Sequence, residues 1–474
     1  MPHVPPPRVP AARGRTQLFL ASTLYGAATL AAALDAGLLP AADRRLLVVA
    51  NTAAVPETTP AFDEAPGFGR LRARFDEVRS WNETISPFHP TGWSPRPDDA
   101  PLWERHLRLL WGLGDDDVEI VLESIQVNPA LALAQVFPDA PLEVYADGLM
   151  SYGPTRSKLD PLIGTRVRRL LHLDLVPGLR PLLLTEFGVG AEVVPGEAFT
   201  KVLAELAEAA GPVEAPEGAA LVLGQYLSAL DILTPEEEER LHVRMLRGTV
   251  RRGHRDVVFK PHPSAPPRWS RLLKEEAERL GARLTVLDTP VLAEVLYQRL
   301  RPALVVACFS TALLTARTFH GLPVARAGTD LLLERLTPYQ NSNRVPVTLV
   351  DALLPDLEAP ERPAEVDRPD LEGLLAAVGY AMQPQIHPGL RPAAERWLAA
   401  HLDARTRRYF KRRRLTALAL PGAIPSQLSF LPRNPAIRKV ARRARAVHRK
   451  LTRERPLHKK IHKKIHKTLT RGAA

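Results

Sequence analysis

The residues best suited to chemistry stand in loops that directly follow short apolar runs. In the first such loop, Asp147-Gly148 comes after the run Leu142–Tyr145. A carboxylate at a strand end, followed by a glycine that lets a ligand approach the backbone, can act as a general base toward a sugar hydroxyl. An ordinary Asp-Gly turn is the alternative, so this loop carries weight only together with the others.

A second loop, Lys260-Pro261-His262-Pro263, follows another apolar run. Proline on both sides of His262 restricts its backbone and aims the imidazole. His262 can donate to a phosphate oxygen or protonate a departing phosphate, and Lys260 adds positive charge nearby. A rigid exit loop with an exposed histidine is the alternative.

Hydroxyl and carboxylate groups occur in two further places. Ser310 and Thr311 stand where an apolar run turns into a helix, so they can cap that helix and also bind an anion at its exposed N–H groups. Glu294 follows a third run and can accept hydrogen bonds from two ribose hydroxyls. A solvated helix face is the alternative for Glu294.

Apolar runs alternate with helical patterns along most of the chain, which is typical of α/β domains with a mostly parallel sheet. The first set of expected strands is Thr16–Ala21, Leu46–Ala50, Val118–Leu122, Leu142–Tyr145 and Leu170–Leu175. The second set is Ala220–Gly224, Asp256–Lys260, Leu284–Leu287 and Ala303–Ala307, with a further edge element at Val345–Leu349. Helices are expected at Ala27–Leu38 and Pro392–Phe410.

This pattern predicts two Rossmann-like domains whose ligands bind outside the carboxyl ends of the strands. The expected organisation is a disordered Pro-rich leader (1–14), a first domain (15–210), a Gly/Pro/Glu-rich linker (211–219), a second domain (220–388), a C-terminal helix (389–414) and a basic tail (415–474).

Positive charge is concentrated at the C-terminal end. Residues 404–474 hold 23 Lys and Arg and one acid, Glu454, whereas the other 403 residues carry 41 basic and 51 acidic side chains, a net of −10. Leu457, Ile461 and Ile465 recur every four residues among lysines, a pattern that favours an anionic membrane surface. An acidic polysaccharide, or no dedicated partner, is the alternative. Nucleic acid is disfavoured because no aromatic residues interleave the basic ones.

Composition excludes several other classes. A 474-residue chain with 45% hydrophobic and 24% charged residues is typical of a soluble protein of two or three domains. The single cysteine, Cys308, excludes an internal disulfide and a cysteine-based zinc cluster. Walker, G-x-G-x-x-G, H-E-x-x-H and G-x-S-x-G motifs are missing, and Asp115-Asp116-Asp117 is interpreted as a solvated turn. With neither a secretory signal nor an apolar membrane span, we expect a cytoplasmic location.

Three of these motifs resemble those of a known superfamily. Ala146-Asp147-Gly148, His262-Pro263 and Ser310-Thr311, in this order and each at a strand end, are similar to the motifs of the bacterial sialyltransferases of GT-B fold. The chain most resembles the alpha-2,8-polysialyltransferase family and the related lipooligosaccharide sialyltransferases, from about Thr16 to about Leu353. The resemblance implies a GT-B fold and an inverting, metal-independent transfer of sialic acid from CMP-sialic acid to a glycan.

The resemblance also implies roles for individual residues. Asp147 would be the base that deprotonates the acceptor hydroxyl, and His262 would contact the CMP phosphate and assist its departure as an acid. Ser310 and Thr311 would hold the same phosphate with Lys260 nearby, and Glu294 would bind the ribose. Position 146 is Ala where the family usually has Asp or Glu, which leaves acceptor choice and donor identity open.

Two other interpretations remain at this stage. A GT-B transferase could use another nucleotide-activated sugar or a polyol phosphate, or a catalytically inactive GT-B body could act as a binding module tethered by its tail. The leading interpretation is a cytoplasmic sialyltransferase, peripheral at the inner face of the cell membrane, that acts on a lipid-linked glycan and needs neither a metal nor another cofactor.

Overall fold

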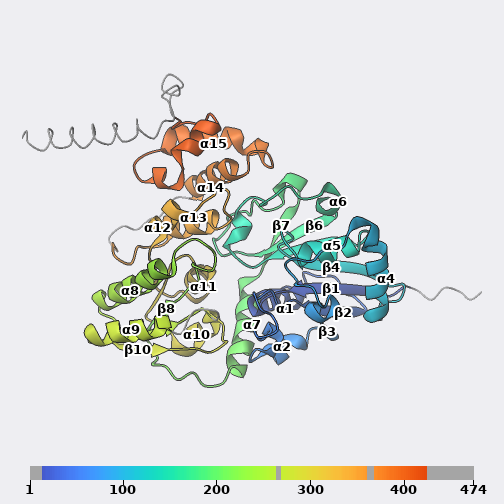
Figure 1. Ribbon diagram of the computed structural model, residues 1–474, viewed down its shortest axis with the longest axis horizontal. Helices are drawn as coiled ribbons and strands as arrows, with labels where there is room; N and C mark the ends of the chain where they lie inside the picture. Colours follow the sequence, from blue (N-terminus) through green and yellow to red (C-terminus); the bar gives the residue numbers. More distant parts are fainter. Residues whose placement is uncertain (1–12, 263–267, 360–367, 424–474) are drawn as a thin grey trace, which may run out of the picture. The chain divides into compact units, whose positions relative to one another are not determined.

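A computed structural model describes residues 13–262, 268–359 and 368–423. The expected leader up to residue 12 and the tail from residue 424 lie outside these residues, as does Pro263 of the His-Pro motif. Helices and strands alternate along the described chain, and the strands form two separate parallel sheets (Figure 1).

The first sheet has seven strands in the order β3-β2-β1-β4-β5-β6-β7, and all neighbouring strands pair in parallel. From β1, the strands β2 and β3 follow on one side of the sheet. The chain then crosses back to β4 on the other side of β1, and β5, β6 and β7 follow there. The order of the strands therefore reverses between β1 and β4. The strands are β1 (Arg15–Ala21), β2 (Arg44–Val49), β3 (Glu77–Ser80), β4 (Asp117–Glu123), β5 (Leu142–Ala146), β6 (Val167–Leu173) and β7 (Gly190–Val194).

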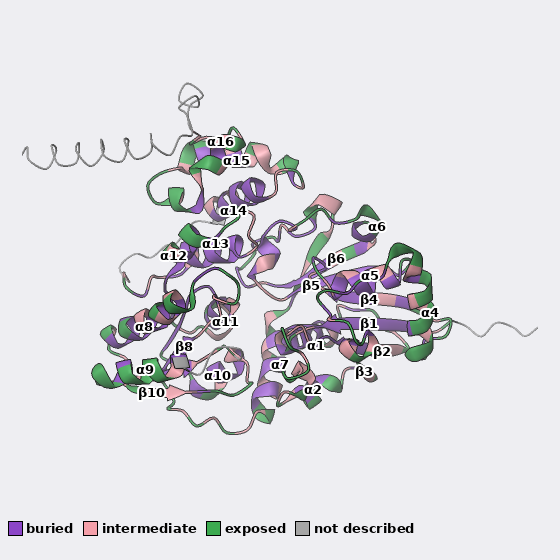
Figure 2. Ribbon diagram, in the orientation of Figure 1, coloured by how far each residue is buried: buried purple, intermediate pink, exposed green. Residues whose placement is uncertain are grey.

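Helices and short 3-10 turns connect these strands. The helices of the first domain are α1 (Leu24–Asp35), α2 (Phe68–Arg72), α3 (Trp81–Thr84), α4 (Ala100–Leu110), α5 (Ala130–Val136), α6 (Pro161–Gly164) and α7 (Gly196–Ala209). The 3-10 turns are η1 (Phe62–Glu64), η2 (Pro97–Asp99), η3 (Leu149–Tyr152) and η4 (Thr185–Phe187). Figure 2 shows the central strands as buried and much of α4 as exposed. Parallel strands covered on both faces require continuous apolar runs, which is why those runs stand out in the sequence.

The second sheet has five parallel strands in the order β10-β9-β8-β11-β12, and its order reverses between β8 and β11. Its strands are β8 (Ala220–Leu223), β9 (Asp256–Lys260), β10 (Arg283–Val286), β11 (Leu304–Ala307) and β12 (Val324–Arg326). Its helices are α8 (Pro235–Arg251), α9 (Arg268–Arg279), α10 (Ala293–Leu300), α11 (Thr311–His320), α12 (Thr329–Arg335) and α13 (Arg344–Leu353). The C-terminal elements are α14 (Arg368–Met382), η5 (Pro388–Leu390), α15 (Arg391–His401), η6 (Thr406–Tyr409) and α16 (Arg412–Ala417).

The nine strands expected from apolar runs are confirmed within a few residues. Helix α1 begins at Leu24, three residues before the predicted start, because the Thr23 side chain caps it by accepting from the backbone N–H of Gly26 at 2.9 Å. The sequence analysis missed β3, β7 and β12. Strands β3 and β7 lie at sheet edges and are mostly half-buried or exposed, so they carry no apolar run.

The edge element expected at Val345–Leu349 is wrong. These residues lie in helix α13, and the strand at that edge of the sheet is β12. Nearly every side chain of α13 is buried, so its apolar run has no helical periodicity and looks like a buried strand. Pro346 is accommodated in the first turn of the helix.

The single helix expected over Pro392–Phe410 is also wrong, because α15 ends at His401. The Asp403 carboxylate accepts from the backbone N–H groups of Arg405 and Thr406, at 2.7 and 2.9 Å, which offers the backbone an alternative to helix. The chain continues as η6 and α16, and Leu415 and Leu420 are each 2% exposed. The packed body therefore extends past residue 415, where the basic tail was expected to begin.

The two domains touch through several side chains. The Tyr25 hydroxyl on α1 lies 3.2 Å from the Thr315 hydroxyl on α11. Thr318 on α11 donates to the backbone carbonyl of Leu175 at 2.8 Å. Helix α7 of the first domain packs against α10 of the second. These contacts bring the carboxyl ends of strands from both sheets toward one another.

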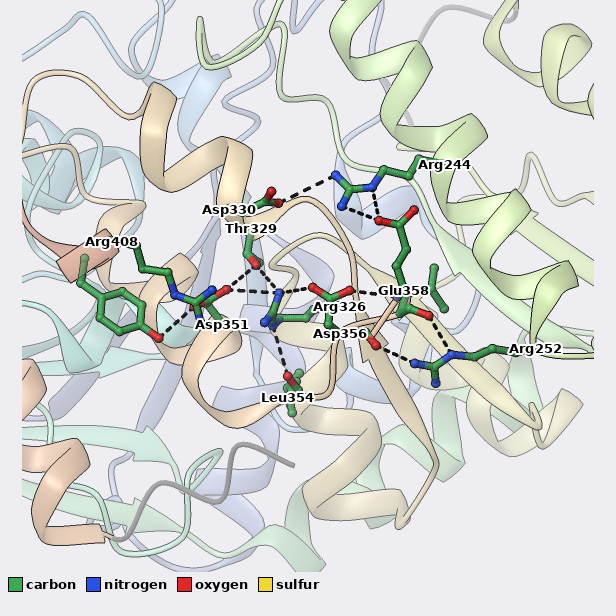
Figure 3. A network of polar contacts seen from close by, with 12 residues as sticks. Arg244, Arg252, Arg326, Thr329, Asp330, Asp351, Leu354, Asp356, Glu358 and Arg408 are labelled. Atoms are coloured by element: carbon green, nitrogen blue, oxygen red, sulfur yellow. Dashed lines mark hydrogen bonds and ion pairs between the residues drawn. The ribbon is translucent and has the colours of Figure 1, made fainter. Parts of the chain in front are cut away.

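A buried ionic network joins the second domain to the C-terminal elements. Asp351 on α13 has no exposed surface, and it accepts from the hydroxyls of Thr329 and Tyr409 at 2.7 and 2.8 Å. Its carboxylate also pairs with Arg326 at 3.2 Å and Arg408 at 2.6 Å. In Figure 3, Asp351 lies between these two arginines. One carboxylate thus links β12, α12, α13 and η6.

Replacing Asp351 by Ala should lower the free energy of unfolding by about 3–5 kcal/mol, because it breaks the buried ion pair with Arg326 and leaves the hydroxyls of Thr329 and Tyr409 without their acceptor. Asp330→Ala is the matched control. Asp330 is largely exposed and pairs with Arg244 at 3.8 Å, and it should cost less than about 1 kcal/mol. Thermal unfolding followed by circular dichroism makes the comparison. Equal losses in the two variants would contradict a structural role for Asp351.

Candidate functional site

A pocket of about 520 Å³ lies where strands of both domains end. Its lining residues lie at or just after the ends of β1, β4 and β5 of the first sheet and of β8 and β11 of the second. The pocket is therefore at the reversal point of both sheets. Ligands of open parallel sheets bind at such points. The lining residues used below are Ser22, Glu123, Ser124, Asp147, Gly148, Leu149, Met150, Arg156, Gln225, Phe309, Ser310 and Thr311.

Asp147 lies in this pocket, directly after β5. Its side chain is densely surrounded by protein but reaches the pocket. Its carboxylate lies close to Gly26 of α1, because a Cβ placed on that glycine would be in van der Waals contact with a carboxylate oxygen, at 3.4 Å. Burial first, and then the charge of Glu123, raise the pKa of Asp147 to about 7. A carboxylate with that pKa is suited to general-base chemistry near neutral pH.

Glu123 is a pocket residue that the sequence analysis missed. It is the last residue of β4, and its carboxylate accepts from the backbone N–H and the hydroxyl of Ser22, both at 2.7 Å. Ser22 follows β1, so this contact spans the reversal point of the first sheet. The Tyr145 hydroxyl lies 3.5 Å from the same carboxylate oxygen, and burial raises the pKa of Glu123. The pocket thus contains a pair of carboxylates although position 146 is Ala.

Ser310 and Thr311 lie across the pocket from Asp147, at the start of α11. The Ser310 hydroxyl caps the helix by accepting from the backbone N–H of Ala312 at 3.3 Å. The Thr311 hydroxyl accepts from the backbone N–H of Leu149 at 3.5 Å. The Asp147 loop of the first domain therefore contacts the hydroxyl loop of the second.

Gln225 fixes the backbone just before these hydroxyls. Its side-chain carbonyl accepts from the backbone N–H of Phe309 at 2.9 Å, which joins the loops that follow β8 and β11. Gln225 belongs to the strand-end turn after β8, and the sequence analysis assigned its side chain no role. Its role depends on β8 and β11 being neighbours in the sheet.

The other three predicted site residues do not line this pocket. Lys260 donates from Nζ to the carbonyl of Thr289 at 3.0 Å, and burial lowers its pKa despite the nearby carboxylate of Glu294. Glu294 is 4% exposed, and burial raises its pKa to about 7. Its charge contributes to the raised pKa of Asp147, so the two carboxylates face a common region.

His262 lies at the end of β9 beside Tyr226, with 6.1 Å between the ring centroids. Burial, and next the charge of Lys260, lower the pKa of His262. The imidazole is therefore neutral at neutral pH until an anion binds beside it. Pro263 and residues up to 267, which continue this loop, lie outside the described chain.

The loop after β4 has a strained backbone. Ser124 and Ile125 have φ values of 58° and 49°, in the left-handed region that side chains disfavour, β-branched ones most of all. Ile125 has no exposed surface, and its packing in the core holds this conformation. Ser124 lies in the pocket wall, so the strain is stored next to the site.

Two searches of the described residues bear on cofactors and membranes. Within residues 13–262, 268–359 and 368–423, no cluster of three or more His, Cys, Asp or Glu residues is arranged to hold a metal ion. In the same ranges, no helix has both the length and the apolar character needed to span a bilayer.

Comparison with known proteins identifies the family. The family model for alpha-2,8-polysialyltransferase (POLYST) matches residues 17–329, which is more than half of the chain. The chain belongs to the alpha-2,8-polysialyltransferase family. The match spans all the candidate residues from Ser22 to Thr311, and it confirms the family predicted from the three motifs. A search of curated proteins found no match.

Several solved structures are similar to the chain at low identity. The GT-B domain of a Photobacterium damselae sialyltransferase is 11% identical, with a TM-score of 0.39 over 71% of this chain and 96% of that one. Acinetobacter baumannii MurG is 9% identical, with a TM-score of 0.38 over 81% and 95%. Phytolacca americana UGT2 is 13% identical, with a TM-score of 0.38 over 81% and 99%.

The fold of this family member is GT-B, with two parallel-sheet α/β domains whose strand ends share one pocket. Membership in the family makes the chain a glycosyltransferase of the sialyltransferase kind. Its substrates are accordingly a nucleotide-sugar donor and a glycan acceptor.

Burial of Asp147 predicts a dependence of stability on pH. Because the folded-state pKa of about 7 lies above the ordinary 3.8, the folded protein holds this proton more tightly than the unfolded chain. The stabilising contribution is complete below pH 4 and is lost as pH rises through 7. Asp147→Asn should therefore melt a few degrees above wild type at pH 8, and the gap should narrow at pH 5.

Thermal melts at both pH values check this expectation, with Asp98→Asn as the control because Asp98 is exposed. The control variant should melt like wild type throughout. A gap for Asp147→Asn that stays constant from pH 5 to pH 8 would show that the carboxyl group does not titrate in this range, and would contradict a pKa of about 7.

Proposed function

We propose that this chain transfers sialic acid from CMP-sialic acid to a hydroxyl of a glycan acceptor, with inversion and without a metal. The observation that carries the proposal is the contact between the Asp147 loop and the Ser310–Thr311 loop. It sets a base with a raised pKa opposite a helix N-terminus with two hydroxyls. That is the arrangement needed when a phosphate leaves one face of a sugar and an alcohol attacks the other.

In this mechanism Asp147 removes the proton of the acceptor hydroxyl as its oxygen bonds to the anomeric carbon of the sugar. The bond from that carbon to the phosphate oxygen of CMP breaks, and its electron pair stays on the phosphate. Ser310 and Thr311, with the N–H groups at the start of α11, stabilise the charge that develops there. His262 donates the proton that the departing phosphate takes up.

Lys260 and Glu294 complete the donor site in this proposal. They lie in the second domain with His262, and their opposite charges interact. Lys260 adds positive charge on the phosphate side. Glu294 accepts hydrogen bonds from the ribose.

Release of CMP from CMP-sialic acid, in the presence of oligosialic or galactose-ended acceptors, tests this assignment. Asp147→Asn and His262→Ala should each lower kcat by roughly 10²-fold or more, because each removes a group that moves a proton in the reaction. His106→Ala is the control, since His106 is exposed on α4 and lies outside the pocket. The kcat/KM of wild type should also fall as pH drops below about 7, the pKa of Asp147.

Each result has a defined meaning. Unchanged release by Asp147→Asn would remove Asp147 from the role of base. Wild type that binds CMP-sialic acid but never releases CMP would indicate an inactive binding module. Release of a different nucleotide, from another activated sugar, would keep the transferase and overturn the donor.

We also propose that residues 404–474 bind an anionic membrane surface and bring the enzyme to a lipid-linked acceptor at the inner face of the cell membrane. Most of that segment lies outside the described residues. In its described part, the side chains of Arg405, Arg407, Arg412 and Arg413 are exposed. Each basic residue near an anionic leaflet contributes about 1 kcal/mol to binding.

Sedimentation of the full chain with lipid vesicles tests the membrane proposal. Vesicles that contain phosphatidylserine should carry the protein down at low ionic strength, and raising the salt concentration should release it. Vesicles of phosphatidylcholine alone should leave the protein in solution. Equal binding to both kinds of vesicle would rule out an electrostatic attachment.

A further inference from the structure

One cation in the pocket has no acidic partner. Among the described residues of the pocket wall, Arg156 is the only basic one. The other side chains of the wall include two carboxylates, several hydroxyls and apolar groups. Within the described chain it forms no ion pair, and its buried Nε has no hydrogen-bond partner. In the described chain, its one side-chain hydrogen bond runs from Nη2 to the sulfur of Met150. Burial lowers the pKa of its guanidinium, and no nearby carboxylate opposes that effect.

Two other arginines of the described chain, one buried and one half-buried, show how a guanidinium is satisfied elsewhere, although Arg45 Nε and Arg344 Nη1 also lack a partner. Arg326 pairs with Asp351 and Asp356 in the network of Figure 3. Arg166 donates to four backbone carbonyls, at 2.6–3.0 Å. A guanidinium has five N–H donors, and leaving them unused in a partly buried site costs free energy. What distinguishes Arg156 is that its unused donors belong to a residue of the pocket wall, where a ligand can supply an acceptor.

The backbone of Arg156 is held in place on both sides. Its N–H donates to the side-chain carbonyl of Gln126, in the loop after β4, at 2.8 Å. Its carbonyl accepts from the side-chain amide of Gln383, just after α14. A residue fixed in this way loses less conformational freedom when it binds a ligand than a residue of a free loop would.

We propose that Arg156 binds the carboxylate of a sugar acid in this pocket. The inference rests on the proposed function, in which the transferred sugar carries a carboxylate on its anomeric carbon. The planar guanidinium matches a carboxylate with two parallel hydrogen bonds. Glu123 and Asp147 give the pocket negative charge, so an acidic sugar needs a cation here to offset their repulsion.

Two sugars can supply this carboxylate. One is the sugar of the donor, and the other is a terminal sialic acid of the acceptor. The phosphate of CMP is a third anion, but in the proposed mechanism Ser310, Thr311 and His262 bind it. The affinity of the Arg156 variant for CMP alone therefore distinguishes the two kinds of subsite. CMP has a phosphate but no carboxylate, so its affinity should fall only if Arg156 binds the phosphate.

Kinetics of Arg156→Gln on CMP-sialic acid, with sialic-acid-ended and galactose-ended acceptors, make the main test. Loss of the paired hydrogen bonds should lower kcat/KM by roughly 10- to 100-fold. A loss with both acceptors assigns the carboxylate to the donor, and a loss with the sialic-acid-ended acceptor alone assigns it to the acceptor. In either case the affinity for CMP should stay at the wild-type value.

Two control variants test whether the guanidinium itself binds the sugar. Lys158→Gln, an exposed neighbour in the same loop, should behave like wild type. Arg156→Lys keeps the charge but not the planar fork, so it should lose activity in the same direction but less, and it guards against misfolding of Arg156→Gln. Equal kinetics of Arg156→Gln and Lys158→Gln, or a parallel loss of CMP affinity, would overturn the proposal.

A binding measurement separates this inference from the proposed transfer reaction. Saturation-transfer NMR can compare free N-acetylneuraminic acid with its uncharged methyl ester on the full-length protein. Wild type should bind the acid better than the ester, and Arg156→Gln should bind the two alike. This binding measurement does not depend on turnover. If the chain releases no CMP, the proposed reaction is disproved, while the comparison of acid and ester still tests the carboxylate subsite. Equal binding of acid and ester by wild type would disprove the subsite.

Discussion

The closeness of two buried carboxylates shapes the whole site. Glu123 and Asp147 follow neighbouring strands, and neither pairs with a cation among the described residues. Ser22 offsets part of the cost for Glu123 with two hydrogen bonds across the reversal point of the sheet. Asp147 receives less compensation, and its raised pKa is the result. A carboxylate that holds its proton weakly near neutral pH is what proton abstraction from an alcohol requires.

The second domain supplies what the first lacks. The first domain contributes two acids to the pocket, whereas the second contributes hydroxyls and a helix N-terminus. In the proposed mechanism the two acids thus lie on the side where a proton is removed, and the hydrogen-bond donors on the side where a phosphate leaves. The direct hydrogen bond between Leu149 and Thr311 holds the two regions against each other.

Much of this could be predicted from sequence, because strands buried on both faces must be continuously apolar and their ends carry the ligand loops. This reasoning led to Asp147, Ser310 and Thr311, which line one pocket in the structure, and to His262, which lies outside its wall. Elements without that signal were missed or misassigned: β3 and β7 are mostly polar, and the fully buried α13 resembles a strand. Glu123 and Arg156 were missed for a different reason. Glu123 is distinguished by its contacts with residues more than twenty positions away in sequence, and Arg156 by the lack of an acidic partner anywhere in the described chain.

The C-terminal elements have a consequence for any shortened form of the chain. Arg414 on α16 donates to the last carbonyls of α14, those of Ala381 and Met382, at 2.6 and 3.2 Å. The next residue, Gln383, holds the backbone of Arg156 in the pocket. These hydrogen bonds therefore connect the start of the basic segment to Arg156 in the pocket wall. A deletion that removes the proposed membrane-binding segment without disturbing the pocket has to begin after residue 422, where the packed unit ends.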